Sequence, residues 1–207
     1  MPTYRYVFFD LRGKGEIVRL CFHAAGVKFE DVRLDHDSWP ENVRGREASP
    51  FGQLPYLEID GKKFAQSIAI AQYIAREYGL YGDNSLENLS IDGVVGLTID
   101  YFTRWARATY GPEDAKRRAE LQAKVYSEDL PKFLQQLEEL LIENKTGYFV
   151  GNKLTLADLK VYTTLENSFQ EFPDMYTKYP QVLAHRKKVG SQPGIAAYLS
   201  SRKPTPV

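Results

Sequence analysis

The fold is decided by residues 54–67, which read LPYLEIDGKKFAQS. Two short runs, LPYLEI at 54–59 and KKFA at 62–65, flank Asp60-Gly61. This dipeptide supplies the positive φ angles that a tight hairpin turn needs, so the two runs are expected to form antiparallel strands.

The neighbouring segments extend this hairpin into a layered fold. Ser67 precedes apolar residues at helical spacing that end at Gly79, so we expect Ser67 to be the N-cap of a helix. Towards the N-terminus, the patterns predict a strand at 3–9, a helix at 16–25 and a strand at 28–34. A strand, a helix and a strand in so short a space make a right-handed βαβ unit.

The rest of the chain is predicted to be helical. Apolar residues recur at helical spacing over 88–110 and 113–143, and Pro131 is expected to kink or break the second helix. Further helices are indicated by a capping box at Thr155 and Asp158 and by short patterns near 179–189 and 193–201. The predicted fold class is therefore an α/β thioredoxin-like domain of order βαβ-ββα at 1–80, followed by an all-α domain at 81–207.

Composition excludes several classes of protein. The 207 residues include 27 Lys+Arg and 27 Asp+Glu, a formal net charge of zero, which argues against a nucleic-acid partner. No apolar run reaches the roughly 18–20 residues of a membrane span. Arg5, Asp10 and Arg12 interrupt what would be the core of a signal peptide. With Cys21 as its one cysteine, which we expect to be a buried structural thiol, the chain is predicted to be cytoplasmic.

Two features of the hairpin region could bind a peptide. A cis bond before Pro55 would leave the backbone of Leu54 unpaired and turned outward. Ser67 offers a hydroxyl and free N–H groups at a helix N-terminus, where a carboxylate can bind. Either feature alone also fits a turn proline or an ordinary helix cap. Trp39 lies in a polar segment and suggests a further contact, whereas His23, His36 and His185 show no metal-ligand spacing.

Matching segments along nearly the whole chain point to one family. They are 1–4, 9–16, 37–40, 50–55, 65–71, 150–158 and 198–204. Together they resemble the sigma class of cytosolic glutathione transferases, a family that also includes glutathione-dependent prostaglandin D synthase and the lens S-crystallins. The resemblance implies a cytoplasmic, homodimeric detoxification enzyme. Reduced glutathione would be its co-substrate, without a permanently bound cofactor, and a small hydrophobic electrophile its second substrate.

The resemblance also implies roles for individual residues. Gln53, Leu54 and Pro55 would hold the cysteinyl backbone of glutathione, and Gln66 and Ser67 its γ-glutamyl carboxylate. The remaining implied positions are Lys14, Trp39 and Arg44 or Arg46 at the glycyl end, Asp100 of the partner subunit at the amine, Phe51 as the dimer key, and Phe9, Leu11, Gly13, Phe102 and Trp105 around the hydrophobic substrate.

The chain departs from the family at the catalytic position, where Phe8 stands in place of a tyrosine that donates a hydrogen bond to the glutathione sulfur. A free thiol of pKa ~8.5 is only a few per cent ionised at neutral pH. Losing a hydrogen bond of roughly 1.5–3 kcal/mol should lower reactivity about ten- to a hundredfold. Tyr4 and Tyr6 share the face of Phe8, but each two-residue step along a strand is about 6.6–6.8 Å, so neither can replace it. Support of the thiolate by Lys14 and an engineered origin of Phe8 both stay open.

A second departure concerns metal and isomerase activity. The sigma members that isomerise prostaglandin H bind a divalent cation through acids near Asp100, and here Gly96 and Ile99 occupy two of those positions. We therefore expect no metal site. Conjugation is the favoured function. The alternatives are a non-enzymatic glutathione-binding, ligand-binding or crystallin-like structural protein, and a glutathione-dependent isomerase or peroxidase.

Overall fold

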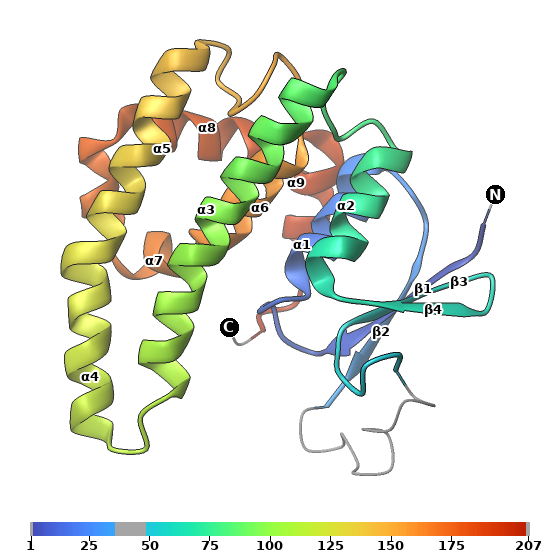
Figure 1. Ribbon diagram of the computed structural model, residues 1–207, viewed down its shortest axis with the longest axis horizontal. Coiled ribbons are helices and arrows are strands. Elements are labelled where there is room, and N and C mark those ends of the chain that lie inside the picture. Colours follow the sequence, from blue (N-terminus) through green and yellow to red (C-terminus); the bar gives the residue numbers. More distant parts are fainter. Residues whose placement is uncertain (1, 36–48, 206–207) are drawn as a thin grey trace. The chain divides into compact units, whose positions relative to one another are not determined.

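The computed structural model describes residues 2–35 and 49–205 (Figure 1). Its contacts divide the chain into two compact units. The first unit comprises the described parts of Met1–Tyr81 and Gly190–Val207, and the second is Gly82–Val189. The C-terminal segment therefore groups with the N-terminal residues, whereas the domain limits of 1–80 and 81–207 stay a prediction.

The first unit contains the predicted four-stranded mixed sheet, in the order β2-β1-β3-β4 (Figure 1). Strand β1 runs parallel to β2 and antiparallel to β3, which forms the predicted hairpin with β4. The strands are β1 (Tyr4–Phe9), β2 (Glu30–Leu34), β3 (Tyr56–Ile59) and β4 (Lys62–Ala65). At the turn, Asp60 and Gly61 have the expected positive φ angles of 48° and 85°.

The described residues of the same unit form the helices α1 (Glu16–Ala25), α2 (Ser67–Glu77) and α9 (Pro193–Ser201). Helix α1 packs on both α2 and α9. The contact with α9 depends on Gly194, because a Cβ atom there would lie 2.1 Å from the carbonyl oxygen of His23. Glycine thus lets the C-terminal helix approach the backbone of α1.

The predicted capping role of Ser67 is wrong. Ser67 is the first residue of α2, and the N-cap is Gln66, which has φ 77° and makes no side-chain capping hydrogen bond. A positive φ outside glycine is uncommon, and the serine pattern did not reveal it. The N–H groups of the first turn keep the orientation expected of a helix N-terminus.

The second unit consists of helices (Figure 1). In chain order they are α3 (Ser85–Tyr110), α4 (Ala115–Lys124), the π-helical η2 (Val125–Asp129), α5 (Leu130–Asn144), α6 (Leu156–Thr164), α7 (Glu166–Glu171), the 3₁₀ segment η3 (Pro173–Lys178) and α8 (Pro180–Gly190). Helix α3 starts three residues before the predicted position, because the Asn84 side chain accepts hydrogen bonds from the amides of Leu86 and Glu87. The sequence patterns did not predict α7 or η3.

At the break expected near Pro131, the chain changes from an α-helix to a short π-helical segment. Proline has no N–H for the carbonyl of Ser127, four residues before it. The chain forms the π-helical segment Val125–Asp129 at this point, with the amide of Leu130 bonded to the carbonyl of Val125, and Pro131 lies in the first turn of α5. The helix predicted over 113–143 is therefore divided into two helices around a π segment.

The capping box at the start of α6 is confirmed. The buried Asp158 accepts hydrogen bonds from the amides of Thr155, at 2.8 Å, and Phe149, at 3.0 Å. His185 from α8 places its Nε2 2.9 Å from the same carboxylate. His185 is thus a structural residue, as expected, and ties α8 to the start of α6.

Candidate functional site

The hairpin end consists of Leu54, Pro55, Gln66 and Ser67. The Leu54–Pro55 bond is cis, as expected. Tyr56 pairs with Ala65 in the hairpin, so Pro55 and Gln66 are the next residues outward on two neighbouring strands. The register therefore brings the cis bond and the start of α2 side by side.

The start of α2 provides hydrogen-bond donors for an anion. The first N–H groups of a helix lack partners within the helix and carry a partial positive charge. No acidic residue lies in the first turn of α2 to neutralise them. Ser67 is half-buried and Gln66 is exposed, so a ligand in solvent can reach the N–H groups at the start of α2 and the side chains of these two residues. This arrangement suits a carboxylate.

The segment before the cis bond is held by Ser49. The buried Ser49 hydroxyl donates a hydrogen bond of 2.5 Å to the carbonyl of Gln53, and the Ser49 carbonyl accepts one of 2.9 Å from Gly52. Phe51, in the turn between them, is 61% exposed. It lies at an apolar groove of about 340 Å³ whose lining includes Phe64 and Tyr73. An exposed phenylalanine in an apolar groove suits an interface between proteins.

The β1 end comprises Phe8, Phe9 and the loop to Gly15. Val7 of β1 pairs with Tyr56, so Phe8 follows at the same end of the sheet as Pro55 and Gln66. The Phe8 ring is buried and close to Gly15, where a Cβ atom would lie 2.1 Å from its Cδ1. Phe8, where the resemblance leads us to expect a tyrosine, is thus a packed ring without a hydroxyl.

The tyrosines that share the face of Phe8 have other partners. The Tyr4 hydroxyl lies 2.9 Å from that of Tyr78 and 3.4 Å from that of Tyr73. The Tyr6 hydroxyl donates a hydrogen bond of 3.2 Å to the carbonyl of Gly15. Burial raises the pKa of both Tyr4 and Tyr6 well above the ordinary value. These contacts agree with the expectation that neither residue replaces the missing hydroxyl.

The loop after β1 contains other residues named from the sequence. Lys14 is exposed there, and Phe9 and Leu11 are half-buried. A Cβ atom on Gly13 would lie 2.8 Å from Cδ1 of Leu11, so the leucine folds over the glycine. Trp39, Arg44, Arg46 and His36 lie outside the described residues.

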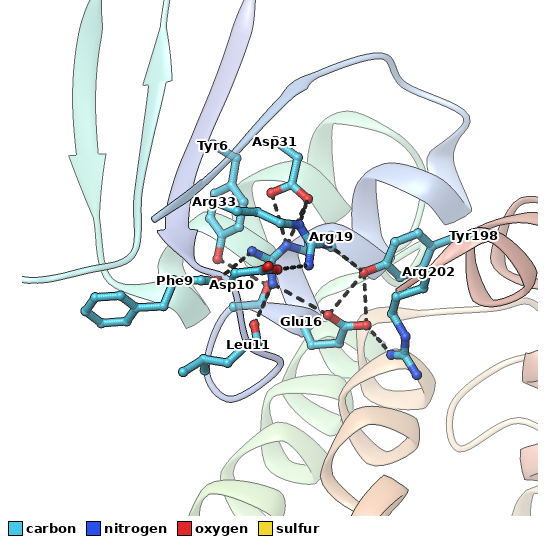
Figure 2. A network of polar contacts seen from close by, with 11 residues as sticks. Tyr6, Phe9, Asp10, Leu11, Glu16, Arg19, Asp31, Arg33, Tyr198 and Arg202 are labelled. Atoms are coloured by element: carbon cyan, nitrogen blue, oxygen red, sulfur yellow. Dashed lines mark hydrogen bonds and ion pairs between the residues drawn. The ribbon is translucent and has the colours of Figure 1, made fainter. Parts of the chain in front are cut away.

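Sequence reasoning missed Arg19, which holds this loop in place (Figure 2). Its side chain is fully buried, and its Nη atoms donate to the carbonyls of Leu11, at 2.8 Å, and Phe9, at 3.1 Å. Its Nε lies 3.1 Å from both carboxylate oxygens of Asp31. A possible signal was the pair Glu16 and Arg19, three residues apart on an otherwise apolar helix.

The same network reaches the C-terminal helix α9 (Figure 2). The Tyr198 hydroxyl donates to both oxygens of Glu16, at 3.1 and 3.2 Å, and Arg202 forms an ion pair with that carboxylate. Arg33 bridges Asp31 and Asp10, at 2.8 and 2.9 Å. Buried charges need such partners, so the network fixes β2, α1 and α9 around the β1 end.

The second unit carries the other residues named from the sequence. Phe102 and Trp105 are neighbours on α3, with ring centroids 5.5 Å apart, and the Trp105 indole donates a hydrogen bond of 3.0 Å to the Tyr126 hydroxyl. Asp100 is exposed at a polar cavity of about 150 Å³, beside Arg104. Gly96 and Ile99 lie on the same helix. Among the described residues, no group of three or more His, Cys, Asp or Glu could hold a metal ion.

Two properties define the class of protein. A thioredoxin-like sheet presents a cis-proline beside a helix N-terminus, and an all-helical unit follows it. Such an arrangement can bind an extended peptide through the exposed strand-end backbone and a carboxylate through the helix donors.

Comparison with known proteins identifies the family. The family models described as "Glutathione S-transferase, N-terminal domain" and "Glutathione S-transferase, C-terminal domain" match residues 5–76 and 99–202. The chain belongs to the glutathione S-transferase family. The predictions of the fold and of a glutathione transferase with glutathione as co-substrate are thereby confirmed at the level of the family.

Three relatives illustrate the range of similar proteins. Hematopoietic prostaglandin D synthase of Gallus gallus is 38% identical over 212 residues and the full length of both chains. S-crystallin SL11 of Nototodarus sloanii is 34% identical and covers 99% of each chain. The structure of monomeric Na-GST-3, a glutathione S-transferase of Necator americanus, aligns over 98% of each chain with a TM-score of 0.85 and 34% identity. The chain therefore resembles enzymes and crystallins alike.

No helix in the described part of the chain is both long and apolar enough to span a membrane.

Proposed function

We propose that this protein is a sigma-class glutathione transferase that binds reduced glutathione at the hairpin end and conjugates it slowly to hydrophobic electrophiles. The observation that carries the proposal is the register of three adjacent strands. It places Phe8, the cis bond at Pro55 and the start of α2 at one end of the sheet. A peptide bound there has its backbone beside Leu54 and its thiol towards Phe8.

Glutathione binding uses donors and charges matched to the tripeptide. The γ-glutamyl carboxylate accepts hydrogen bonds from the amides and hydroxyl at Gln66 and Ser67. The backbone of Gln53 and Leu54 pairs with the cysteinyl residue, as an added strand would. At the two ends of the tripeptide we propose Lys14, Trp39 and Arg44 for the glycyl carboxylate and Asp100 of the partner subunit for the amine.

The chemistry is a nucleophilic attack by sulfur. The thiol loses its proton to solvent, the thiolate forms a bond to the electrophilic carbon, and a leaving group departs with the bonding electrons. In the family the tyrosine hydroxyl stabilises the thiolate, and a hydrogen bond to a charged group contributes roughly 1.5–3 kcal/mol. The Phe8 ring cannot donate such a bond. We therefore expect nearly unchanged glutathione affinity and a lowered rate.

We further propose a cytoplasmic homodimer that acts in detoxification. The exposed Phe51 would insert into the partner subunit, and the apolar groove lined by Phe64 and Tyr73 supports an interface on this face. The related Na-GST-3 is monomeric, so the oligomeric state needs measurement. Sedimentation of the native protein beside Phe51→Ser tests it. The proposal predicts a dimer for the first and a monomer for the second, and a native monomer contradicts it.

A second candidate function is a non-enzymatic glutathione-binding or crystallin-like role. Phe8 favours it, because a protein that needs no turnover can lose the catalytic hydroxyl, and the similarity to S-crystallin SL11 agrees with it. The similarity to prostaglandin D synthase supports a glutathione-dependent isomerase as a further alternative, with peroxide reduction by the same thiolate as another.

Calorimetric titration with glutathione, beside turnover of a hydrophobic aryl chloride, tests the proposal. Saturable binding with slow but measurable turnover supports a transferase. Binding without turnover supports a non-enzymatic glutathione-binding role. Absence of binding contradicts the transferase and leaves the crystallin-like structural role.

A further inference from the structure

A lysine lies among aromatic side chains in the helical unit. Lys160 of α6 places its Nζ 5.6 Å from the ring centroid of Phe102 on α3. The Phe102 ring contacts the indole of Trp105, and the indole N–H donates a hydrogen bond to the Tyr126 hydroxyl. The Tyr126 ring in turn contacts Phe172, with ring centroids 4.7 Å apart. One cationic group thus adjoins a continuous aromatic cluster.

The Lys160 ammonium has no counterion within residues 2–35 and 49–205. Its hydrogen bond there is to a neutral group, the Thr164 hydroxyl one turn along α6, at 2.9 Å. Other cations of this unit are paired with carboxylates, for example Arg104 with Asp129 at 3.0 Å and Lys153 with Asp83 at 2.5 Å. A charge withdrawn from water without a partner is costly, so such groups commonly serve a ligand.

Burial has a measurable effect on this group. The residue keeps some exposed surface, but desolvation lowers the pKa of the Lys160 ammonium from 10.5 to about 8. At neutral pH the protonated form still dominates. The group therefore acts as a cation with free N–H donors rather than as a nucleophile, and an anionic ligand would supply the missing counterion.

We propose that Lys160 recognises an anionic group on the second substrate, and that the preferred electrophiles are hydrophobic molecules bearing a carboxylate. The aromatic cluster binds the apolar body, and the ammonium binds the carboxylate at its edge. This inference rests on the proposed function and on the position of Phe102 and Trp105 around the hydrophobic substrate, which the family resemblance implies. It adds the substrate class, which the site residues named from the sequence do not specify.

The test compares two ligands that differ mainly in charge, 1-naphthaleneacetate and 1-naphthaleneacetamide, by calorimetry on the full chain near neutral pH. We expect the native protein to bind the acid about tenfold more tightly than the amide, as a charge-assisted hydrogen bond would give. Lys160→Met should remove this preference by weakening the acid alone, and Lys160→Arg should retain much of it. Lys116→Met, at an exposed lysine of the same unit, should leave it unchanged.

Three outcomes with the two naphthalene ligands overturn the inference. It is wrong if the native protein binds neither ligand or shows no preference for the acid, or if Lys160→Met keeps the preference. Lys160→Gln provides a second neutral variant if the methionine variant does not fold. Glutathione is titrated into the same samples. Loss of glutathione binding with a retained acid preference would contradict the proposed function but not the role of Lys160.

Discussion

The hairpin end and the β1 end lie at the same end of one sheet, but they offer a ligand different chemistry. The hairpin end presents a cis bond at Pro55 and the helix donors at Ser67. The β1 end presents the buried ring of Phe8, and the nearby hydroxyl of Tyr6 is bonded to Gly15. The comparison teaches that binding and thiol activation depend on different residues, so one can be lost while the other persists.

The largest expected effect is a loss of stability when Arg19, which holds the β1 end, is replaced. Arg19→Met removes one of the two arginine partners of Asp31 and leaves the carbonyls of Phe9 and Leu11 without their donor, and we expect a loss of about 2–5 kcal/mol in the free energy of unfolding. Urea denaturation measures this loss. Arg117→Met, at an exposed i,i+3 pair, is the control and should change stability by about 1 kcal/mol or less. A loss equally small for Arg19→Met would show that the network does not hold the loop.

The next largest effect is a change in turnover at the β1 end without a change in glutathione affinity at the hairpin end. Phe8→Tyr should raise turnover about ten- to a hundredfold, because the hydroxyl stabilises the thiolate by roughly 1.5–3 kcal/mol. Glutathione affinity should stay within about twofold, since the hairpin end is unchanged. Steady-state kinetics and calorimetry measure the two quantities. Phe29→Tyr, at a half-buried phenylalanine of the same unit, should change neither. A change in affinity without a change in turnover would reverse the assignment of the two regions.

A smaller effect is expected at the hairpin end. Ser67→Ala removes one donor but leaves the helix amides, so the dissociation constant for glutathione should rise about three- to tenfold, while the rate at saturation stays nearly constant. Ser85→Ala, at the first residue of α3, is the matched control. Equal effects of the two substitutions would argue against a carboxylate at Ser67.

The smallest effect concerns Tyr6. Removing its hydrogen bond to Gly15 by Tyr6→Phe should cost about 0.5–1.5 kcal/mol of stability. The pKa of Tyr6 is raised by burial above its ordinary value of 10.0. The unfolded chain therefore binds fewer protons than the folded chain once the pH exceeds 10, and stability falls as pH rises. Unfolding measured across this range should show a weaker decline for Tyr6→Phe, and identical slopes would contradict the expectation.

The parts of the fold that the sequence predicted are those set by neighbouring residues. Asp60-Gly61 specifies its turn through backbone conformation alone, and Thr155 and Asp158 form their capping box within one helical turn. The start of α2 was misplaced by one residue because the positive φ of Gln66 has no compositional signal. The Arg19 network escaped prediction because Tyr198, which binds Glu16 beside Arg19, is distant in sequence.

The features of the candidate site also fall into those that the local sequence predicts and those that need the structure. The cis bond at Pro55 and the position of Phe8 could be expected from local motifs and from a family resemblance. The lack of a counterion for Lys160 among the described residues could not be expected, because it depends on which side chains α3 and α6 bring together. Patterns within one element predict its type, whereas pairing between elements needs the structure.

The most direct test of the account is the pKa of the glutathione thiol in the complex, measured by ultraviolet absorbance of the thiolate as pH is varied, for the native protein and Phe8→Tyr. We predict a value near that of the free thiol, ~8.5, for the native protein, and a value about one to two units lower for Phe8→Tyr. A strongly lowered value in the native protein, unchanged by the tyrosine, would show that another group activates the thiol and would contradict the separation of binding from activation.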